Sequence, residues 1–348
     1  MNEIKQSVQK YYSEVLKSSS DLKTNACCAA GEPPSWMKAI IGNIADSVLD
    51  RFYGCGFPVS EAVEGCTVVD LGCGSGRDVY IYSQLVGEQG KVYGIDMTRE
   101  QLDVARSAVD EQSKVFGYSK SNVEFFESYI ENLTELELNG KADLVVSNCV
   151  VNLSPDKKKV LEGVAHILKE GGEFYFSDVF CDRRLSDELR SNEMLYGECL
   201  GGALYVNDFI SLAKAAGFKD PRLVSESPIE LDEEVRELTG MARFVSRTYR
   251  LFKISDLEDK CEDYGQTVEY NGLIKHFPHL FKLDDHHFFE TGRPERVCGN
   301  TADMILQSRF SRYFKVTGNK DHHFGEFSCG DTMAAEQYRN PTEGSSCC

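Results

Sequence analysis

The sequence predicts an α/β protein in which a doubly wound, Rossmann-like parallel sheet is followed by a small C-terminal α+β domain. Three observations predict this fold. Short β-branched segments alternate with amphipathic segments up to about residue 180, a glycine-rich turn follows the first strand-like segment, and the alternation is lost after residue 181. Since alternating strands and helices pack as a parallel sheet with helices on both faces, such a sheet is expected in the first half of the chain.

The first expected strand lies within TVVDLGCGSG at 67–76, which is β-branched and then rich in glycine. Residues 77–87 have helical periodicity up to a glycine stop, and KVYGID at 91–96 is typical of a second strand. A helix is expected at 98–116, which opens with a threonine cap and keeps its apolar residues on one face. The alternation continues with strands at 122–128, 142–151 and 173–179 and a helix at 155–169.

After residue 181 the pattern predicts two helices within 186–217, around the Gly-Gly pair of YGECLGGALY (196–205), and a strand at 242–254. Short strand-like pieces and acidic turns follow, which indicates a smaller appended domain. We therefore expect an N-terminal helical cap, a cofactor-binding domain, a substrate-binding region and a C-terminal domain with a flexible tail, at residues 1–60, 61–180, 181–254 and 255–348.

Composition and charge exclude several classes of protein. No run among the 348 residues approaches the roughly 18 apolar residues of a membrane-spanning helix, so no membrane association is expected. The amino terminus lacks the apolar block of a secretory signal, which favours a cytoplasmic location. A net charge of −18 would repel phosphate backbones, so nucleic acid is not an expected partner. Thirteen cysteines in such a chain favour metal or redox chemistry over a disulfide framework.

The glycine-rich turn indicates a bound cofactor. A dinucleotide loop has the spacing G-x-G-x-x-G, which would require a third glycine at Arg77, whereas this chain has D-x-G-x-G-x-G from Asp70 to Gly76. That pattern resembles the S-adenosylmethionine loop of class I methyltransferases. Asp96 ends the second strand, where a carboxylate can accept hydrogen bonds from ribose hydroxyls.

Two cysteines lie where a methyl acceptor is expected. Cys149 follows the fourth strand in SNCVVNL, at the edge of the sheet where the cofactor would bind, and Cys199 precedes the Gly-Gly pair. Thiolates select soft centres, and trivalent arsenic is strongly thiophilic. The two cysteines are therefore candidates to hold one arsenic atom from two parts of the chain.

The chain resembles the arsenite S-adenosylmethionine methyltransferase family over about residues 10 to 255. The order of the matching blocks and the placement of their cysteines carry the resemblance. The blocks are YYSEVLKSSSDLKTNACC (11–28), RFYGCG (51–56), VVDLGCGSGRD (68–78), VYGIDMT (92–98), SNCVVNLSPDK (147–157), GGEFYFSDV (171–179), YGECLGGALY (196–205) and RFVSRTYRLFK (243–253).

This resemblance implies roles for individual residues. Cys149 and Cys199 match the family's arsenic-binding pair. Cys27 and Cys55 match two cysteines used in catalysis and redox cycling; Cys27 is also a candidate third arsenic ligand, and the neighbouring Cys28 could share its role. The implied cofactor-binding residues are Tyr53, Asp70, Gly72, Gly74, Gly76, Asp96, Met97, Gln101, Ile130, Glu131 and Asn148.

The resemblance also implies the reaction, a stepwise transfer of methyl groups from S-adenosylmethionine to thiolate-bound arsenic(III). Arsenite and methylarsenite, free or as glutathione conjugates, would be the substrates, thioredoxin or glutathione would be the reductant, and the protein is expected to be a monomer. Two alternatives stay open. A methyltransferase of a small organic substrate would tolerate loss of Cys149 and Cys199, and a thiol-based arsenic- or metal-binding protein would not need the cofactor loop.

The remaining cysteines and the histidine pairs are expected to have no part in the chemistry. We expect packing roles for Cys66, Cys73, Cys181, Cys261, Cys298 and Cys329, and a place in the tail, with arsenic scavenging as an alternative, for Cys347 and Cys348. The two His-His pairs, at 286–287 and 322–323, are expected at the surface, since no metal-ligand spacing accompanies them.

Overall fold

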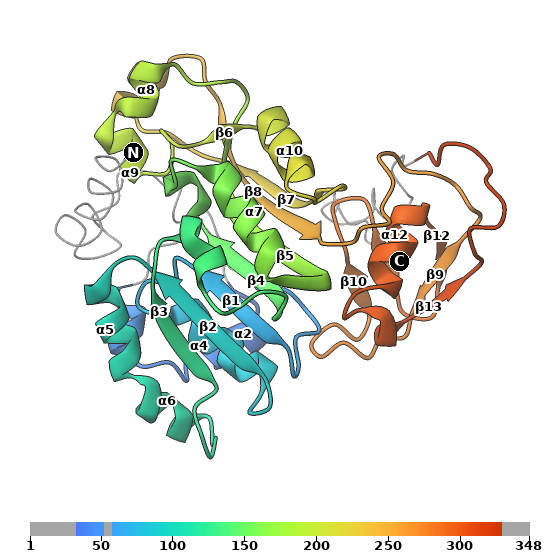
Figure 1. Cartoon of the computed structure of the whole chain (residues 1–348), viewed down its shortest axis with the longest axis horizontal. Coiled ribbons are helices and arrows are strands. Elements are labelled where there is room, and N and C mark those ends of the chain that lie inside the picture. The colour runs from blue at the N-terminus through green and yellow to red at the C-terminus, as the bar shows by residue number, and fades with distance from the viewer. Residues whose placement is uncertain (1–32, 52–57, 329–348) are drawn as a thin grey trace, which may run out of the picture.

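The structure is a computed structural model, and it describes residues 33–51 and 58–328. Figure 1 shows a central twisted sheet with helices on both faces and, beside it, a smaller lobe of short strands and helical segments that follows the sheet in the chain. In the described ranges, no helix has the length and apolar character needed to cross a membrane.

The central sheet has eight strands. Its order is β3-β2-β1-β4-β5-β8-β7, with the short β6 paired to β5. The first five strands of this order are parallel, β8 runs antiparallel to β5, and β7 runs antiparallel to β8. The strands are β1 Thr67–Leu71, β2 Lys91–Asp96, β3 Val123–Glu127, β4 Ala142–Asn148, β5 Leu168–Cys181, β6 Leu204–Tyr205, β7 Arg222–Pro228 and β8 Phe244–Phe252.

Helices cover the two faces of this sheet and bury one hydrophobic core on each (Figure 1). Val164 of α7 and Phe209 of α10 pack into the core on one face, and Tyr80 of α4 and Leu102 of α5 pack into the core on the other. The helices before the C-terminal lobe are α2 Ser35–Ile41, α3 Asp46–Leu49, α4 Arg77–Val86, α5 Arg99–Ser107, α6 Val109–Val115, η4 Ile130–Glu135, η5 Val151–Leu153, α7 Lys157–Ile167, α8 Asp187–Ser191, α9 Glu193–Gly197, α10 Val206–Ala215 and α11 Glu233–Thr239.

The predicted parallel sheet is confirmed. Strand β7 and helix α11 were not predicted, and β5 begins at Leu168, within the helix expected at 155–169. Three further elements differ from the prediction. The helix expected at 98–116 breaks at Ala108, whose N–H bonds the carbonyl of Ala105, three residues back instead of four. The strand expected at 142–151 ends at Asn148, because the next residue has φ +58°, which no strand accommodates. The two helices expected within 186–217 are three, since the first is divided at Asn192 into α8 and α9.

The C-terminal lobe has its own small core, formed by residues such as Val268, Phe281 and Phe310. It contains the sheet β12-β9-β13, the hairpin β10-β11 and one helix longer than a single turn. Its elements are β9 Thr267–Tyr270, β10 Leu280–Lys282, β11 Phe288–Glu290, β12 Pro294–Arg296, α12 Gly299–Leu306, η6 Ser311–Tyr313 and β13 Phe314–Thr317. The domain boundaries drawn from the sequence stay a prediction.

One histidine expected at the surface is buried instead. His287 packs against Arg222 of β7, and its Nδ1 lies 2.8 Å from Oδ1 of Asp284. The other three histidines of the two pairs are at least partly exposed. In the part of the chain that the structure describes, no group of three or more His, Cys, Asp or Glu side chains could hold a metal ion.

Candidate active site

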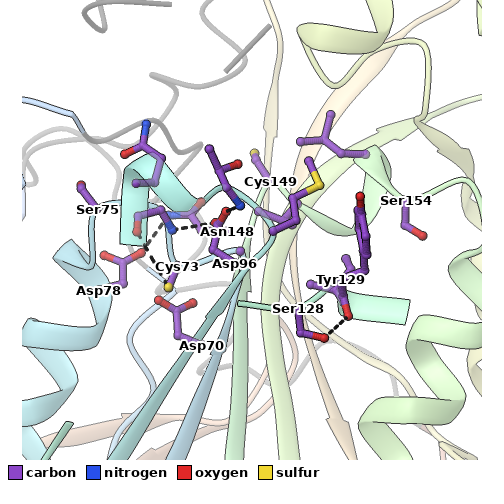
Figure 2. Close-up of a pocket in the computed structure, with 18 of the residues that line it drawn as sticks. Asp70, Cys73, Ser75, Asp78, Asp96, Ser128, Tyr129, Asn148, Cys149 and Ser154 are labelled. Carbon is purple, nitrogen blue, oxygen red and sulfur yellow. Dashed lines mark hydrogen bonds between the residues drawn. The ribbon is translucent and has the colours of Figure 1, made fainter. Parts of the chain in front are cut away.

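A cavity lies at the carboxyl ends of β1, β2 and β4, where the strand order of the parallel sheet reverses. This is where doubly wound sheets bind their ligands. Figure 2 shows three carboxylates on one side of the cavity and Tyr129 and Ser154 on the other, with Cys149 between them. Its volume, open mouth included, is about 1060 Å³. The lining residues are Arg51, Asp70, Gly72, Cys73, Gly74, Ser75, Asp78, Asp96, Met97, Thr98, Gln101, Ser128, Tyr129, Ile130, Glu131, Asn148, Cys149, Val150, Leu153 and Ser154.

The glycines of the loop after β1 have different tasks. Gly72 has φ +69°, and a β-carbon there would lie 2.4 Å from the side chain of Val150, so only glycine fits. Gly74 also has positive φ and lines the cavity. Gly76 is not among the lining residues; it caps α4, where a β-carbon would lie 3.1 Å from that of Ala105. The first two glycines therefore shape the cavity and the third lets α4 pack.

The cavity holds acceptors suited to a ligand with hydroxyl and amino groups. Asp96 accepts hydrogen bonds from the N–H groups of Gly74 and Thr98, at 2.9 and 2.7 Å. Burial raises the pKa of Asp96, and burial together with the charges of Asp78 and Asp96 raises the pKa of Asp70 well above its usual range. A positively charged ligand would favour the ionised carboxylates and so bind more tightly here.

An amide on α5 is a further acceptor. Oε1 of Gln101 is buried and has no hydrogen-bond partner among the residues that the structure describes. Buried polar atoms are nearly always satisfied, so a ligand donor is expected at this atom. Together with the glycine loop and the carboxylates, this acceptor fits the nucleoside part of S-adenosylmethionine. Predicted residues Met97, Ile130, Glu131 and Asn148 also line the cavity, whereas Tyr53 lies outside the described residues.

The structure brings the two predicted arsenic-binding cysteines together. Cys149 lines the cavity, and the thiol of Cys199 donates a hydrogen bond to the Cys149 carbonyl at 3.2 Å. Cys149 is disulfide-bonded and Cys199 is a thiol, so the two are not joined to each other. The predicted residues Cys27, Cys28 and Cys55 lie outside the described residues.

Both cysteines have a backbone conformation that is rare for their residue type. In the described ranges, four residues other than glycine have positive φ, and Cys149 at +58° and Cys199 at +62° are two of them. Strained backbone of this kind tends to occur at functional sites, where the surrounding structure holds it in place. The occurrence of this strained conformation at both cysteines indicates that their contact is more than packing.

The Gly-Gly pair after Cys199 explains how the two segments come so close. A β-carbon on Gly202 would lie 2.0 Å from the carbonyl oxygen of Asn152, and one on Gly201 would lie 2.9 Å from the backbone nitrogen of Tyr196. Neither position can hold a side chain unless backbone moves. Gly202 thus lets the loop after α9 lie directly on the turn after β4, and Gly201 lets that loop fold back against α9.

Sequence reasoning missed two ionisable groups that bind the turn after β4, Asp178 and Lys157. Asp178 of β5 accepts the N–H of Asn152 at 2.9 Å and its pKa is raised to about 7, mainly by burial. Lys157, the first residue of α7, has its pKa lowered to about 8, also mainly by burial, and Asp178 opposes that shift. The signal in the sequence was a carboxylate that follows the aromatic run of the strand EFYFSDV.

Other lining residues were also missed. Cys73 was expected only to pack, yet it lines the cavity, and its sulfur would lie 2.8 Å from a β-carbon on Gly94. Arg51, the first residue of the block RFYGCG, lines the cavity too but was given no role. Ser128 and Tyr129 also line it, and no motif pointed to them.

The strand order, the glycine loop and the acidic cavity define a Rossmann-like methyltransferase, and residues 62–226 match the family described as "Methyltransferase domain". Residues 263–345 match the "Arsenite methyltransferase C-terminal domain". The chain belongs to the arsenite methyltransferase family.

Named relatives support this membership over nearly the whole chain. The arsenite methyltransferase of Aquipseudomonas alcaligenes is 52% identical over 99% of both chains, and that of Homo sapiens is 43% identical over 90% of this chain and 84% of its own. The crystal structure of an arsenic(III) S-adenosylmethionine methyltransferase from Chlamydomonas reinhardtii is 47% identical, has a TM-score of 0.83, and covers 85% of this chain and 100% of its own. The family likeness thus extends beyond residue 255, where the sequence blocks ended.

Proposed function

We propose that this protein transfers methyl groups from S-adenosylmethionine to arsenic(III) held by Cys149 and Cys199. The observation that carries the proposal is the contact of the Cys199 thiol with the Cys149 carbonyl, 3.2 Å away, beside a cavity that fits the methyl donor. Such a place brings a thiolate-bound atom and the donor into one site, and juxtaposition of two reactants is a large part of catalysis.

The transfer needs no base at the acceptor. Arsenic(III) bound by thiolates keeps a lone pair, which attacks the methyl carbon of the sulfonium while the carbon–sulfur bond breaks toward sulfur. An arsenic–carbon bond forms, S-adenosylhomocysteine leaves as a neutral thioether, and arsenic is formally oxidised from III to V. Asp70, Asp96 and Gln101 would hold the donor, and Cys149 and Cys199 would orient arsenic.

A thiol reductant is required twice in this scheme. Cys149 is disulfide-bonded in the structure, so it must be reduced before it can bind arsenic. Arsenic(V) must return to arsenic(III), and two thiols can supply both electrons by forming a disulfide. Cys27 and Cys55 are our candidates for that couple, with thioredoxin or glutathione as the external cytoplasmic reductant. A Cys55→Ser protein should then stop after about one turnover; sustained turnover with unchanged products would contradict this role.

The test is separation of arsenic species after incubation of the protein with arsenite, S-adenosylmethionine and a thiol reductant. Methylated arsenic is expected from the parent protein and not from Cys149→Ser or Cys199→Ser, although both variants should bind the donor normally. Cys261→Ser is the control, because this thiol lies in the C-terminal lobe away from the cavity. If the parent binds the donor but forms no methylated arsenic, an organic acceptor becomes the better proposal.

A further inference from the structure

The turn at residues 149–154 joins the donor cavity to Cys199, and side chains from elsewhere hold it. Four of its residues line the cavity, and its first residue is Cys149. Each of its six carbonyl groups accepts a hydrogen bond. Two of the six bonds are internal, from the N–H groups of Leu153 and Ser154. The other four come from three side chains, those of Lys157, Tyr196 and Cys199.

Lys157 makes two of these four bonds. Its Nζ donates to the carbonyl of Asn152 at 3.1 Å and to that of Ser154 at 2.9 Å. Helical side chains lean toward the amino end of their helix, so a lysine in the first position of α7 is directed back over the turn that precedes it. The helix start itself is fixed by Asp156, whose side chain accepts the N–H of Lys159.

A lysine is an unexpected residue at this position. Cations are unfavourable at the amino end of a helix, where the dipole is positive, and the first turn of α7 contains no acidic residue. Lys157 is also half-buried. Neither helix formation nor solubility explains it, so its contacts with the turn are the better reason for its presence.

Four ionisable groups interact electrostatically with Lys157. Asp178, Cys199 and Glu131 all interact favourably with its ammonium group, and Arg190 interacts unfavourably. Asp178 holds the turn through the N–H of Asn152, and Glu131 does so through the hydroxyl of Ser154, at 2.8 Å. Within residues 33–51 and 58–328, Lys157 is thus the one cation seen to bind the turn directly, beside two carboxylates that bind it as well.

We propose that Lys157 is a positioning residue for methyl transfer: its ammonium group fastens the 149–154 turn so that Cys149, at the donor cavity, stays against Cys199. This inference rests on the proposed function, because it concerns the geometry of the same two thiols. It assigns to Lys157 no contact with arsenic or with the methyl donor.

The test compares Lys157→Met, which keeps the length of the side chain and loses its donors, with Lys158→Met. Lys158 is the matched control, since its side chain is exposed and its one ion partner among the residues that the structure describes is Glu162, one turn along the helix. Lys157→Met should lower kcat/KM for arsenite at least tenfold and change the Kd of S-adenosylmethionine less than threefold. Lys157→Arg, which keeps the charge and can donate to two carbonyls, should recover part of the loss.

A second measurement does not depend on arsenic. In reduced protein, a bifunctional thiol reagent such as dibromobimane should bridge Cys149 and Cys199, and mass spectrometry of the digested protein identifies the bridged peptides. Bridging should fall at least fivefold in Lys157→Met and stay at the parent level in Lys158→Met. Unchanged bridging and arsenite kinetics in Lys157→Met would overturn the inference, as would a parallel loss of donor binding. Should Lys157→Met not fold, the same criteria apply to Lys157→Arg, with a smaller decrease in both readouts.

The two proposals can fail separately. If the parent protein methylates no arsenic but Lys157→Met still lowers bridging, the proposed function fails and the positioning role stands. If the parent methylates arsenic and Lys157→Met behaves as Lys158→Met does, the proposed function stands and the positioning role of Lys157 fails.

Discussion

Cys199 occupies a position that proteins usually fill with glycine. Helix α9 ends in a Schellman motif: the N–H of Leu200 bonds the carbonyl of Leu195 at 2.9 Å, and the N–H of Cys199 bonds that of Tyr196 at 3.1 Å. Cys199 is the left-handed residue of this motif, where a β-carbon is strained. Glycine adopts this conformation without strain, so the backbone alone does not explain a cysteine at this position.

Because of this strain, we expect the glycine variant at position 199 to be more stable than the alanine variant, which reverses the usual order. In reduced protein, Cys199→Gly should have a free energy of unfolding about 1 kcal/mol higher than Cys199→Ala, because only glycine relieves the left-handed backbone. Urea unfolding measures the difference. The same two substitutions at Cys181, the buried last residue of β5, are the control, because its φ is not positive; they should give the ordinary order, with alanine more stable than glycine. Equal order at both sites would show that Cys199 is unstrained.

Asp178 predicts a pH dependence of stability. Its pKa of about 7 lies well above the ordinary value of 3.8. Between about pH 4 and 7 the folded protein keeps a proton that the unfolded chain has released, so the contribution of Asp178 to stability falls as pH rises through that window. Asp178→Asn cannot titrate and should remove this slope, which is at most about 1.4 kcal/mol per pH unit.

Urea unfolding of parent and Asp178→Asn at several pH values between 4.5 and 7.5 tests the slope. The free energy of unfolding of Asp178→Asn, minus that of the parent, should increase as pH increases. Asp110→Asn, on the exposed side of α6, should run parallel to the parent. If Asp178→Asn also runs parallel to it, Asp178 titrates at an ordinary pKa.

At the scale of elements, the site depends on the close approach of the loop after α9 to the turn after β4. The sequence showed both segments, and the strand and helix periodicities were largely correct. It did not show that the strand at 142–151 stops at Asn148, because its apolar letters continue through Val151. The strand ends where Cys149 turns left-handed, and that turn is held by contacts with Ser177 and Cys199.

Substitution of Gly202 tests whether the loop after α9 must lie close to the turn after β4. Gly202→Ala would place a β-carbon 2.0 Å from the Asn152 carbonyl, so the two segments must separate. A misplacement of about 1 Å can lower a rate about 100-fold, and we expect a loss of that order in arsenite methylation with normal donor binding. Gly42→Ala, at the end of α2, is the control because its nearest neighbour would be 3.3 Å away and its φ is ordinary. Full activity of Gly202→Ala would show that the contact is not needed.

At the scale of the whole molecule, a buried ion cluster joins the C-terminal lobe to the sheet. Glu173 of β5 pairs with Arg250 of β8 at 2.6 Å and with Arg309 of the lobe at 2.5 Å. Arg250 also pairs with Glu61 at 2.8 Å and is fully buried. Four stretches of the chain, at residues 61, 173, 250 and 309, thus meet at one set of charges.

Loss of one member should leave the others buried without compensation. Arg250→Met is expected to lower the free energy of unfolding by about 3–5 kcal/mol, which is the usual result when one partner of a buried pair is removed. Arg293→Met, which breaks an exposed pair with Glu290, should lower it by less than about 1 kcal/mol. Chemical denaturation measures both. A loss near 1 kcal/mol for Arg250→Met would mean that water reaches the cluster.

The sequence by itself determined the parallel sheet, the cofactor loop and the candidate thiols, because periodicity, glycine spacing and residue type are local properties. Only the tertiary structure decided that Cys149 and Cys199 meet, that Lys157 and Asp178 bind the turn that begins at Cys149, and that His287 is buried rather than exposed. These facts depend on which segments pack together, across 50 residues in the Cys199–Cys149 contact. Burial and long-range contact are set by the folded chain as a whole, and no short stretch of sequence encodes them.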